Sequence, residues 1–282
     1  MSVSNIPKSS SLTGKKKLDE KPLPIKSDKP KEVDEILNEQ IEAGQKEYGR
    51  SNIGLFISSV AGGLEIGFSL LLMGVLLTLF QGQVSASSLK FMMAVSYPLG
   101  FIFVIIGRSE LFTEHTALAM VPVLNGKQTV RSLLILWGLV YFGNVLGGFG
   151  FALFITYLAP EIGFIKVSAF EYIANHLLDY PSDTIFFSAI LAGWLMGLLG
   201  WLVTSSQETI SRIFVIILVT VVIALGGLHH CIIGSIEVIS GVITSDELTF
   251  GDYIRFQWWA TIGNLVGGAV FVALLKYSHV KN

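Results

Sequence analysis

Two copies of a Gly-Asn-x-x-Gly-Gly motif constrain this chain more than any other feature. One lies within Tyr-Phe-Gly-Asn-Val-Leu-Gly-Gly at 141–148 and the other within Ala-Thr-Ile-Gly-Asn-Leu-Val-Gly-Gly at 260–268, so Asn144 and Asn264 are 120 positions apart. Each copy lies in an apolar run long enough to cross a bilayer, which takes about 20 residues. The repeat predicts a membrane domain of two related halves with a site between them.

The composition agrees with this interpretation. Of the 282 residues, 52% are hydrophobic and only 14% are charged, whereas soluble domains carry about 25% charged residues. The single cysteine, Cys231, excludes an intramolecular disulfide and a thiolate metal site. We expect a multi-pass membrane protein with no metal and no cofactor.

The N-terminal segment differs from the rest of the chain. Residues 1–50 hold 10 of the 19 Lys and Arg residues, and their low apolar content predicts a largely disordered cytoplasmic tail over 1–31. The pattern over 32–48 predicts a short amphipathic helix. The basic run at 15–17 indicates contact with anionic lipid rather than nucleic acid. We therefore divide the chain into a tail, 1–50, and a six-helix membrane channel domain, 51–282.

Six apolar stretches predict six transmembrane helices in an all-α protein. They run over about 53–80, 89–123, 133–158, 184–203, 213–244 and 256–277. Residues 159–183 are predicted to form a polar outer loop. Six passes place both termini on one side, and the distribution of Lys and Arg places that side in the cytoplasm of a cell (inner) membrane.

Polar residues interrupt the second and fifth stretches. The interruptions are Gly-Arg-Ser-Glu-Leu-Phe-Thr-Glu-His at 107–115 and Gly-Gly-Leu-His-His-Cys at 226–231. Broken backbone at membrane depth is tolerated only where it packs inside protein or lines a cavity. Each half is therefore predicted to contain a helix, a broken helix and a second unbroken helix. Because each half makes three passes, the two halves have opposite orientations. This is a 3+3 inverted repeat.

Three polar positions in apolar surroundings form the predicted pore site: Thr113, His230 and Asn264. An imidazole that titrates near neutral pH can donate to an anion and exchange a proton with it. Thr113 could orient the ring, and Asn264 could fix the loop or the tautomer. For Asn144 we favour a structural role in satisfying backbone groups. The polar residues predicted near the pore are Glu110, Glu114, His115 and His229.

The order and spacing of these motifs resemble the formate/nitrite transporter family over about residues 50–280. The resemblance rests on Glu110-Leu-Phe-Thr113, on Leu228-His-His230 and on the paired Gly-Asn motifs. It implies an aquaporin-like fold, a homopentamer with one pore per protomer, and passage of a small monovalent anion or its neutral acid, such as formate, nitrite, acetate or hydrosulfide. It also implies an apolar constriction made by Tyr97, Phe101, Leu111, Phe112 and Ile223.

The chain departs from the family pattern in ways that leave its substrate open. His229 stands where many members have an acid, and a vestibular lysine expected ahead of the fourth span has no counterpart in 176–184. Extra charged residues indicate a divergent branch: Glu65, Arg108, Glu110, Glu114 and Glu237.

Other functions compete with an anion channel. A neutral-solute channel of the same fold lacks support because no Asn-Pro dipeptide occurs in the sequence. A membrane metalloenzyme could use His115, His229, His230, Glu114 and Glu237. However, His229 and His230 would point about 100° apart on a helix, and no histidine recurs at i+3 or i+4. A closed-pore sensor or scaffold with a partner-binding tail stays open. We expect a channel or transporter rather than an enzyme.

Overall fold

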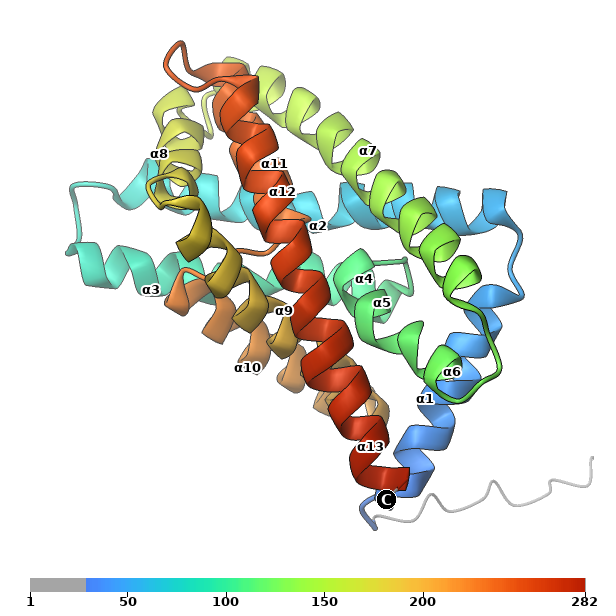
Figure 1. Ribbon diagram of the computed structural model, residues 1–282. Coiled ribbons are helices and arrows are strands. Elements are labelled where there is room, and N and C mark those ends of the chain that lie inside the picture. Colours follow the sequence, from blue (N-terminus) through green and yellow to red (C-terminus); the bar gives the residue numbers. More distant parts are fainter. Residues whose placement is uncertain (1–28, 282) are drawn as a thin grey trace, which may run out of the picture. The chain divides into compact units, whose positions relative to one another are not determined.

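The computed structural model describes residues 29–281, and all regular structure in that range is helical (Figure 1). The chain divides into two units, Met1–Pro30 and Lys31–Asn282. The tail predicted over 1–31 lies almost wholly outside the described residues. The helices are α1 (Val33–Tyr48), α2 (Asn52–Phe80), α3 (Ala86–Ser96), α4 (Pro98–Gly107), α5 (Phe112–Leu118), α6 (Met120–Leu124), α7 (Val130–Ile162), α8 (Val167–Leu178), α9 (Ser182–Ser205), α10 (Thr209–Gly226), α11 (Ile233–Thr244), α12 (Phe250–Val266), the π-helix η1 (Gly267–Leu274) and α13 (Leu275–Lys281).

Six helical segments in the described range are long and apolar enough to cross a membrane, which confirms the predicted fold class. They are α2, the α3–α4 pair, α7, α9, α10 and the continuous rod of α12, η1 and α13. Large apolar side chains are exposed on them, including Phe142, Phe154 and Phe214. Such an apolar surface suits lipid or another membrane helix.

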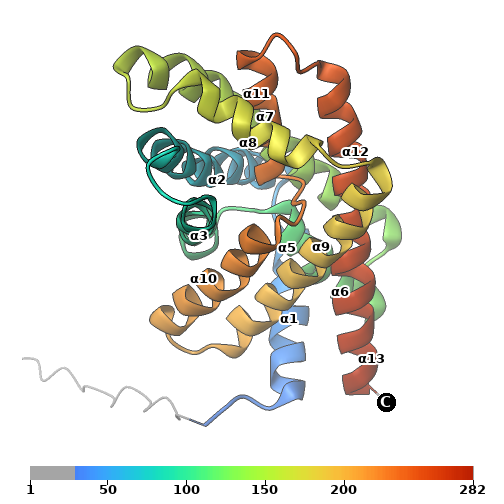
Figure 2. The same cartoon turned by 90° about the vertical axis from the view of Figure 1, so that its left-hand side faces the viewer.

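The second and fifth segments break in the same way. α4 ends at Arg108, whose φ of 63° is left-handed, and α10 ends at Gly227, whose φ is 61°. One residue later, the N–H of Ser109 donates to the Val104 carbonyl and that of Leu228 to the Ile223 carbonyl. This is the Schellman ending, which favours glycine. The chain then continues without regular structure to α5, and through an irregular stretch and a turn at 231–232 to α11. The two loops approach each other in the middle of the bundle (Figure 2).

Glycines let the long helices pack backbone to backbone, again once in each half. A Cβ added at Gly147 of α7 would lie 2.1 Å from the Val60 carbonyl oxygen of α2. A Cβ added at Gly267 would lie 2.2 Å from the Ile190 carbonyl oxygen of α9. Side chains at these positions would force the helices apart, which explains the Gly-Gly pair of each motif.

The prediction that 159–183 forms a polar loop is wrong, because α8 occupies much of it. Phe170, Ile173 and Leu177 recur at helical spacing on α8 and are buried. They belong to the main core, where α8 packs against the half-helix α11. Short apolar stripes of this kind are hard to recognise beside long transmembrane runs.

The helix predicted before the first span is α1, which packs against the bundle. Its residues Ile36, Leu37 and Ile41 are buried in one cluster with Trp201 and Val272. Val33, the first residue of α1, is 45% exposed.

Candidate functional site

Asn144 of α7 fixes the break between α4 and α5. The side chain is fully buried. Its Oδ1 accepts from the backbone N–H of Phe112 at 2.8 Å, and its Nδ2 donates to the carbonyls of Glu110 and Ser59, each at 2.7 Å. The amide thereby satisfies the extended loop on both sides and ties it to α2, in agreement with the structural role favoured from the sequence.

Asn264 of α12 does the same for the second break. Its Oδ1 accepts from the backbone N–H of Cys231 at 2.8 Å. Its Nδ2 donates to the carbonyl of His229 at 3.0 Å and to that of Ala189 on α9 at 2.7 Å. All three bonds are to main-chain atoms, so Asn264 holds the loop on which His230 lies and acts on the predicted site indirectly.

Thr113 and His230, which are 117 positions apart, meet between the two halves. Thr113 Oγ1 lies 2.8 Å from His230 Nε2, and both residues are buried. Thr113 is the second residue of α5, and His230 lies three residues before α11 begins. The structure therefore brings together two of the three residues predicted to form the pore site.

The hydrogen bonds around His230 assign its tautomer. The backbone N–H groups of Ile232 and Ile233 donate to its Nδ1 at 3.3 and 3.4 Å. A nitrogen that accepts cannot carry a proton, so the ring is neutral and its Nε2–H donates to the Thr113 hydroxyl. The imidazole can offer this N–H to a solute only if the solute replaces or joins Thr113.

A cavity lies on each side of this pair. The α8-side cavity, of about 220 Å³, is lined by residues from the start of α3 and the end of α10, including Lys90, Tyr97 and Leu228. The α1-side cavity, of about 750 Å³, is lined by residues from the end of α4 and the start of α10, including Ile106 and Arg212. The cavities thus occupy opposite ends of the same helices, with Thr113 and His230 between them.

The residues predicted for the constriction lie in and around this dividing zone. Phe101 is fully buried, and its ring lies edge-on to His230 at 5.3 Å between centroids. Tyr97 packs on Phe101 at 5.3 Å and, with Ile223, lines the α8-side cavity. These side chains present an apolar surface around the imidazole.

Leu111 and Phe112, the other two predicted constriction residues, belong to the first break. Both are buried in the main core, and the Phe112 ring packs edge-on against Tyr141 of α7 at 5.1 Å.

The predicted pore-proximal residues separate into two groups. Glu110, Glu114 and His115 line the α1-side cavity. His229 does not: its Nδ1 lies 2.8 Å from the Ser188 hydroxyl and its Nε2 lies 3.1 Å from the Leu177 carbonyl. Its ring therefore points toward α8 and α9 while that of His230 points toward Thr113.

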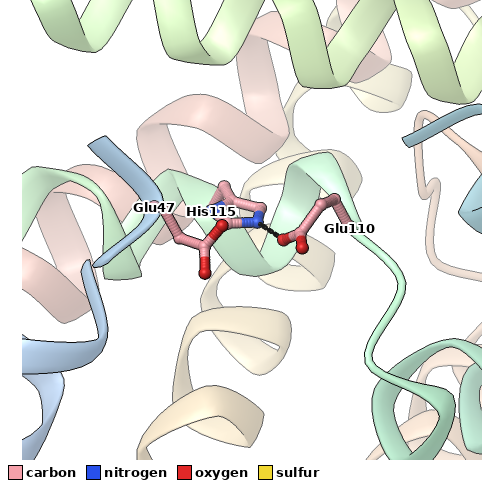
Figure 3. Close-up of side chains that lie close together, drawn as sticks. All are labelled: Glu47, Glu110 and His115. Atoms are coloured by element: carbon pink, nitrogen blue, oxygen red, sulfur yellow. Dashed lines mark hydrogen bonds and ion pairs between the residues drawn. The ribbon is translucent and has the colours of Figure 1, made fainter. Parts of the chain in front are cut away.

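A charged cluster joins α1 to the first break. Glu110 bonds His115 Nε2 (Figure 3). Glu110 also pairs with Arg50, which lies 2.8 Å from Glu47. Ligand atoms of Glu47, Glu110 and His115 lie within 4.8 Å of one another, a spacing that could hold a metal ion. Arg50 already supplies a positive charge to both carboxylates here.

Tyr48 adds a second link between α1 and this region. Its hydroxyl donates to the carbonyl of Ala119 at 2.7 Å. Burial raises the pKa of Tyr48 to about 12, so the phenol is neutral and can donate at physiological pH.

The sequence analysis missed the ionisable residues of the α8-side cavity. Lys90 of α3, His176 of α8 and Glu237 of α11 all line it. Charge alone marked Glu237 as unusual, but a single acid in an apolar run gives no indication of the face on which it lies.

Comparison with known proteins identifies a family model and relatives that match this chain. The model of the formate/nitrite transporter family matches residues 34–278. The inner membrane protein YfdC of Escherichia coli (strain K12) is 33% identical over 244 residues, which cover 85% of this chain and 76% of that protein. The uncharacterized transporter YrhG of Bacillus subtilis (strain 168) is 30% identical over 250 residues, covering 86% and 91%.

Solved structures share the fold. A chain described as an FNT family ion channel superposes with a TM-score of 0.75 at 21% identity, covering 86% of this chain and 98% of that one. A pentameric formate channel with formate bound gives a TM-score of 0.70 at 23% identity, covering 82% and 98%.

Proposed function

The chain belongs to the formate/nitrite transporter family, and from this premise we propose that it conducts a small monovalent weak-acid anion of the formate, nitrite, acetate or hydrosulfide type. The solute crosses the apolar zone around Phe101 and His230 mainly as its neutral acid, with proton exchange near the histidine. The observation that carries the proposal is the buried Thr113–His230 pair between two cavities at opposite ends of the same helices.

The geometry favours passage of the neutral form. An anion stripped of water beside Phe101 and Tyr97 would have several kcal/mol of desolvation cost. A neutral acid avoids most of this cost and can accept a hydrogen bond from His230 Nε2–H or exchange one with the Thr113 hydroxyl. With Nδ1 accepting from the backbone N–H groups of Ile232 and Ile233, the ring is neutral and does not trap an anion as a fixed positive charge would.

Two further proposals concern the assembly and the orientation of the chain. We propose a homopentamer with one pore per protomer, since one of the structural relatives is a pentameric formate channel. We also propose that the two halves have opposite orientations and that both termini face the cytoplasm. The described chain is a multi-pass membrane protein.

Flux measurements with purified protein in liposomes test the proposal. Formate, acetate, nitrite and hydrosulfide are each supplied as a gradient over a range of pH, with glycerol and urea as neutral solutes. We expect the wild type to move at least one weak acid, faster at lower pH. We expect His230→Asn to change the selectivity or to flatten the pH dependence.

His279→Asn is the matched control, because His279 lies exposed on α13, away from the pair. It should behave as the wild type. Flux of glycerol or urea without flux of any weak acid would support a neutral-solute channel instead. No flux of any solute by folded protein would support the closed-pore sensor or scaffold.

A further inference from the structure

Glu237 is a buried carboxyl group that the structure leaves without a protein partner. The residue is 5% exposed and lies on the half-helix α11, which begins just after the His230 loop. Among the described residues, no group forms a hydrogen bond or an ion pair with the carboxyl oxygens of Glu237. Burying a carboxyl group without a hydrogen-bond partner costs free energy of folding, unless water or a solute supplies the partner.

The Glu237 side chain faces the α8-side cavity. It lines this space together with Tyr97 and Ile223, the residues that border the apolar zone around His230. A solute that enters the cavity therefore meets Glu237 before it reaches Phe101 and His230.

We propose that Glu237 binds the carboxyl group of a small monocarboxylic acid by sharing one proton with it. This inference rests on the proposed function and names the substrate class that the α8-side cavity accepts. Two carboxylates at contact distance cannot both be ionised. With one proton between them the pair carries a single negative charge and forms a short, strong O–H···O bond. The proton can come from either partner.

The other groups in the cavity suit this arrangement. The ionisable side chains that line it beside Glu237 are Lys90, His176, Tyr97 and Tyr172. Lys90 is the only lysine or arginine among them. The remaining lining is mostly apolar, including Met73, Leu89 and Ile173, which suits the short alkyl chain of an acid such as acetate.

The size of the cavity limits the solute. Its volume of about 220 Å³ is below the range of about 300–1,000 Å³ that holds drug-sized ligands. Since one liquid water occupies about 30 Å³, the cavity has room for an acid of a few heavy atoms and some water.

Uptake by proteoliposomes tests the inference, with acetate and formate as the acids and hydrosulfide as the comparison. Hydrosulfide has no carboxyl oxygen, and its sulfur is a weak hydrogen-bond partner. Glu237→Gln keeps the shape of the side chain but cannot share a carboxyl proton. We expect its KM for acetate and formate to rise about 10-fold to 100-fold, the factor that a hydrogen bond with a charged partner contributes, whereas the KM for hydrosulfide changes less than about threefold.

Two further variants separate binding from folding. Glu237→Asp keeps the carboxyl group, one methylene shorter, and should recover part of the affinity for the acids. Glu171→Gln removes a carboxyl from α8 that does not line the cavity and should match the wild type. Equal KM values for acetate in Glu237→Gln and the wild type would overturn the inference and leave the proposed function intact.

Infrared difference spectroscopy gives a readout that does not depend on flux. Isotope-labelled acetate is added to the purified wild type, and the carboxyl bands of protein and ligand are compared before and after. We expect both bands to shift together, with the shift reduced in Glu237→Asp. No change in a protein carboxyl band would overturn the inference, even if Glu237→Gln does not fold or if the wild type transports none of the solutes.

Discussion

Replacing Asn264 by alanine should destabilise the protein strongly, because one side chain satisfies three buried backbone groups. The variant leaves the N–H of Cys231 and the carbonyls of His229 and Ala189 without their partners. Each unsatisfied buried group costs about 1–3 kcal/mol. Allowing for some relaxation and for entry of water, we expect a loss of about 3–6 kcal/mol.

The same reasoning predicts an equal effect at the equivalent position in the other half. Asn144→Ala removes bonds to the N–H of Phe112 and the carbonyls of Glu110 and Ser59. The loss of unfolding free energy in Asn144→Ala should match that in Asn264→Ala to within about 1 kcal/mol, given the usual scatter of such values. Asn52→Ala, at an exposed position in the first turn of α2, should change stability by less than about 0.5 kcal/mol.

Unfolding in detergent micelles, followed by the fluorescence of the five tryptophans, measures these differences. Flux through Asn264→Ala should also fall, since the loop that holds His230 is no longer fixed. If Asn264→Ala unfolds at the same denaturant concentration as the wild type, the hydrogen bonds described for the loop do not hold it, and the reasoning fails.

Two further predictions concern packing and pH. Gly147→Ala should destabilise by about 1–3 kcal/mol, since its Cβ would lie 2.1 Å from the Val60 carbonyl oxygen, whereas Gly150→Ala, with no atom within 4 Å, should gain about 0.5–1 kcal/mol from higher helix propensity. Thermal unfolding of the two variants checks this, and equal effects would contradict it. Tyr48→Phe should cost about 0.5–1.5 kcal/mol at neutral pH. Because burial raises the pKa of Tyr48 from 10.0 to about 12, the unfolded chain loses this proton first, so stability should fall as pH rises from 10 towards 12. The Phe variant should lack that part of the fall, and unfolding free energies measured against pH decide it.

The sequence was sufficient for the six membrane-spanning helices and for the two breaks, but not for α8. Apolar runs of transmembrane length can hardly form anything else in a bilayer, and polar residues such as Arg108 and His230 mark the places where those runs cannot continue. The internal repeat adds that the breaks lie at equivalent points, and the structure places Thr113 beside His230 as expected.

Side-chain directions in the breaks could not be predicted. His229 and His230 are neighbours in an extended loop, where successive side chains point to opposite sides, and only the packed structure shows that His229 bonds Ser188 while His230 bonds Thr113. Helical periodicity gives no information there. Asn264 and Glu237 lie on the helices α12 and α11, but a lone polar residue in an apolar run does not show which groups its side chain meets.

The helix extents also differ from the predicted spans for a physical reason. Hydropathy reports the part of a helix that suits lipid, whereas the helix itself continues until a cap or a breaker ends it. Thus α12 begins at Phe250, where Thr249 caps it through Asp252, six residues before the predicted start of the sixth span.

Asn144 and Asn264 hold the two helix breaks through bonds that do not depend on the side chains of the loops. Each amide recognises only main-chain atoms, which every amino acid supplies in the same form, so the residues between the two half-helices can be exchanged without loss of the bonds that hold them. Such a scaffold can take up a new permeant by changing a few loop side chains. It also gives an engineer a place to vary selectivity while the surrounding helices stay as they are.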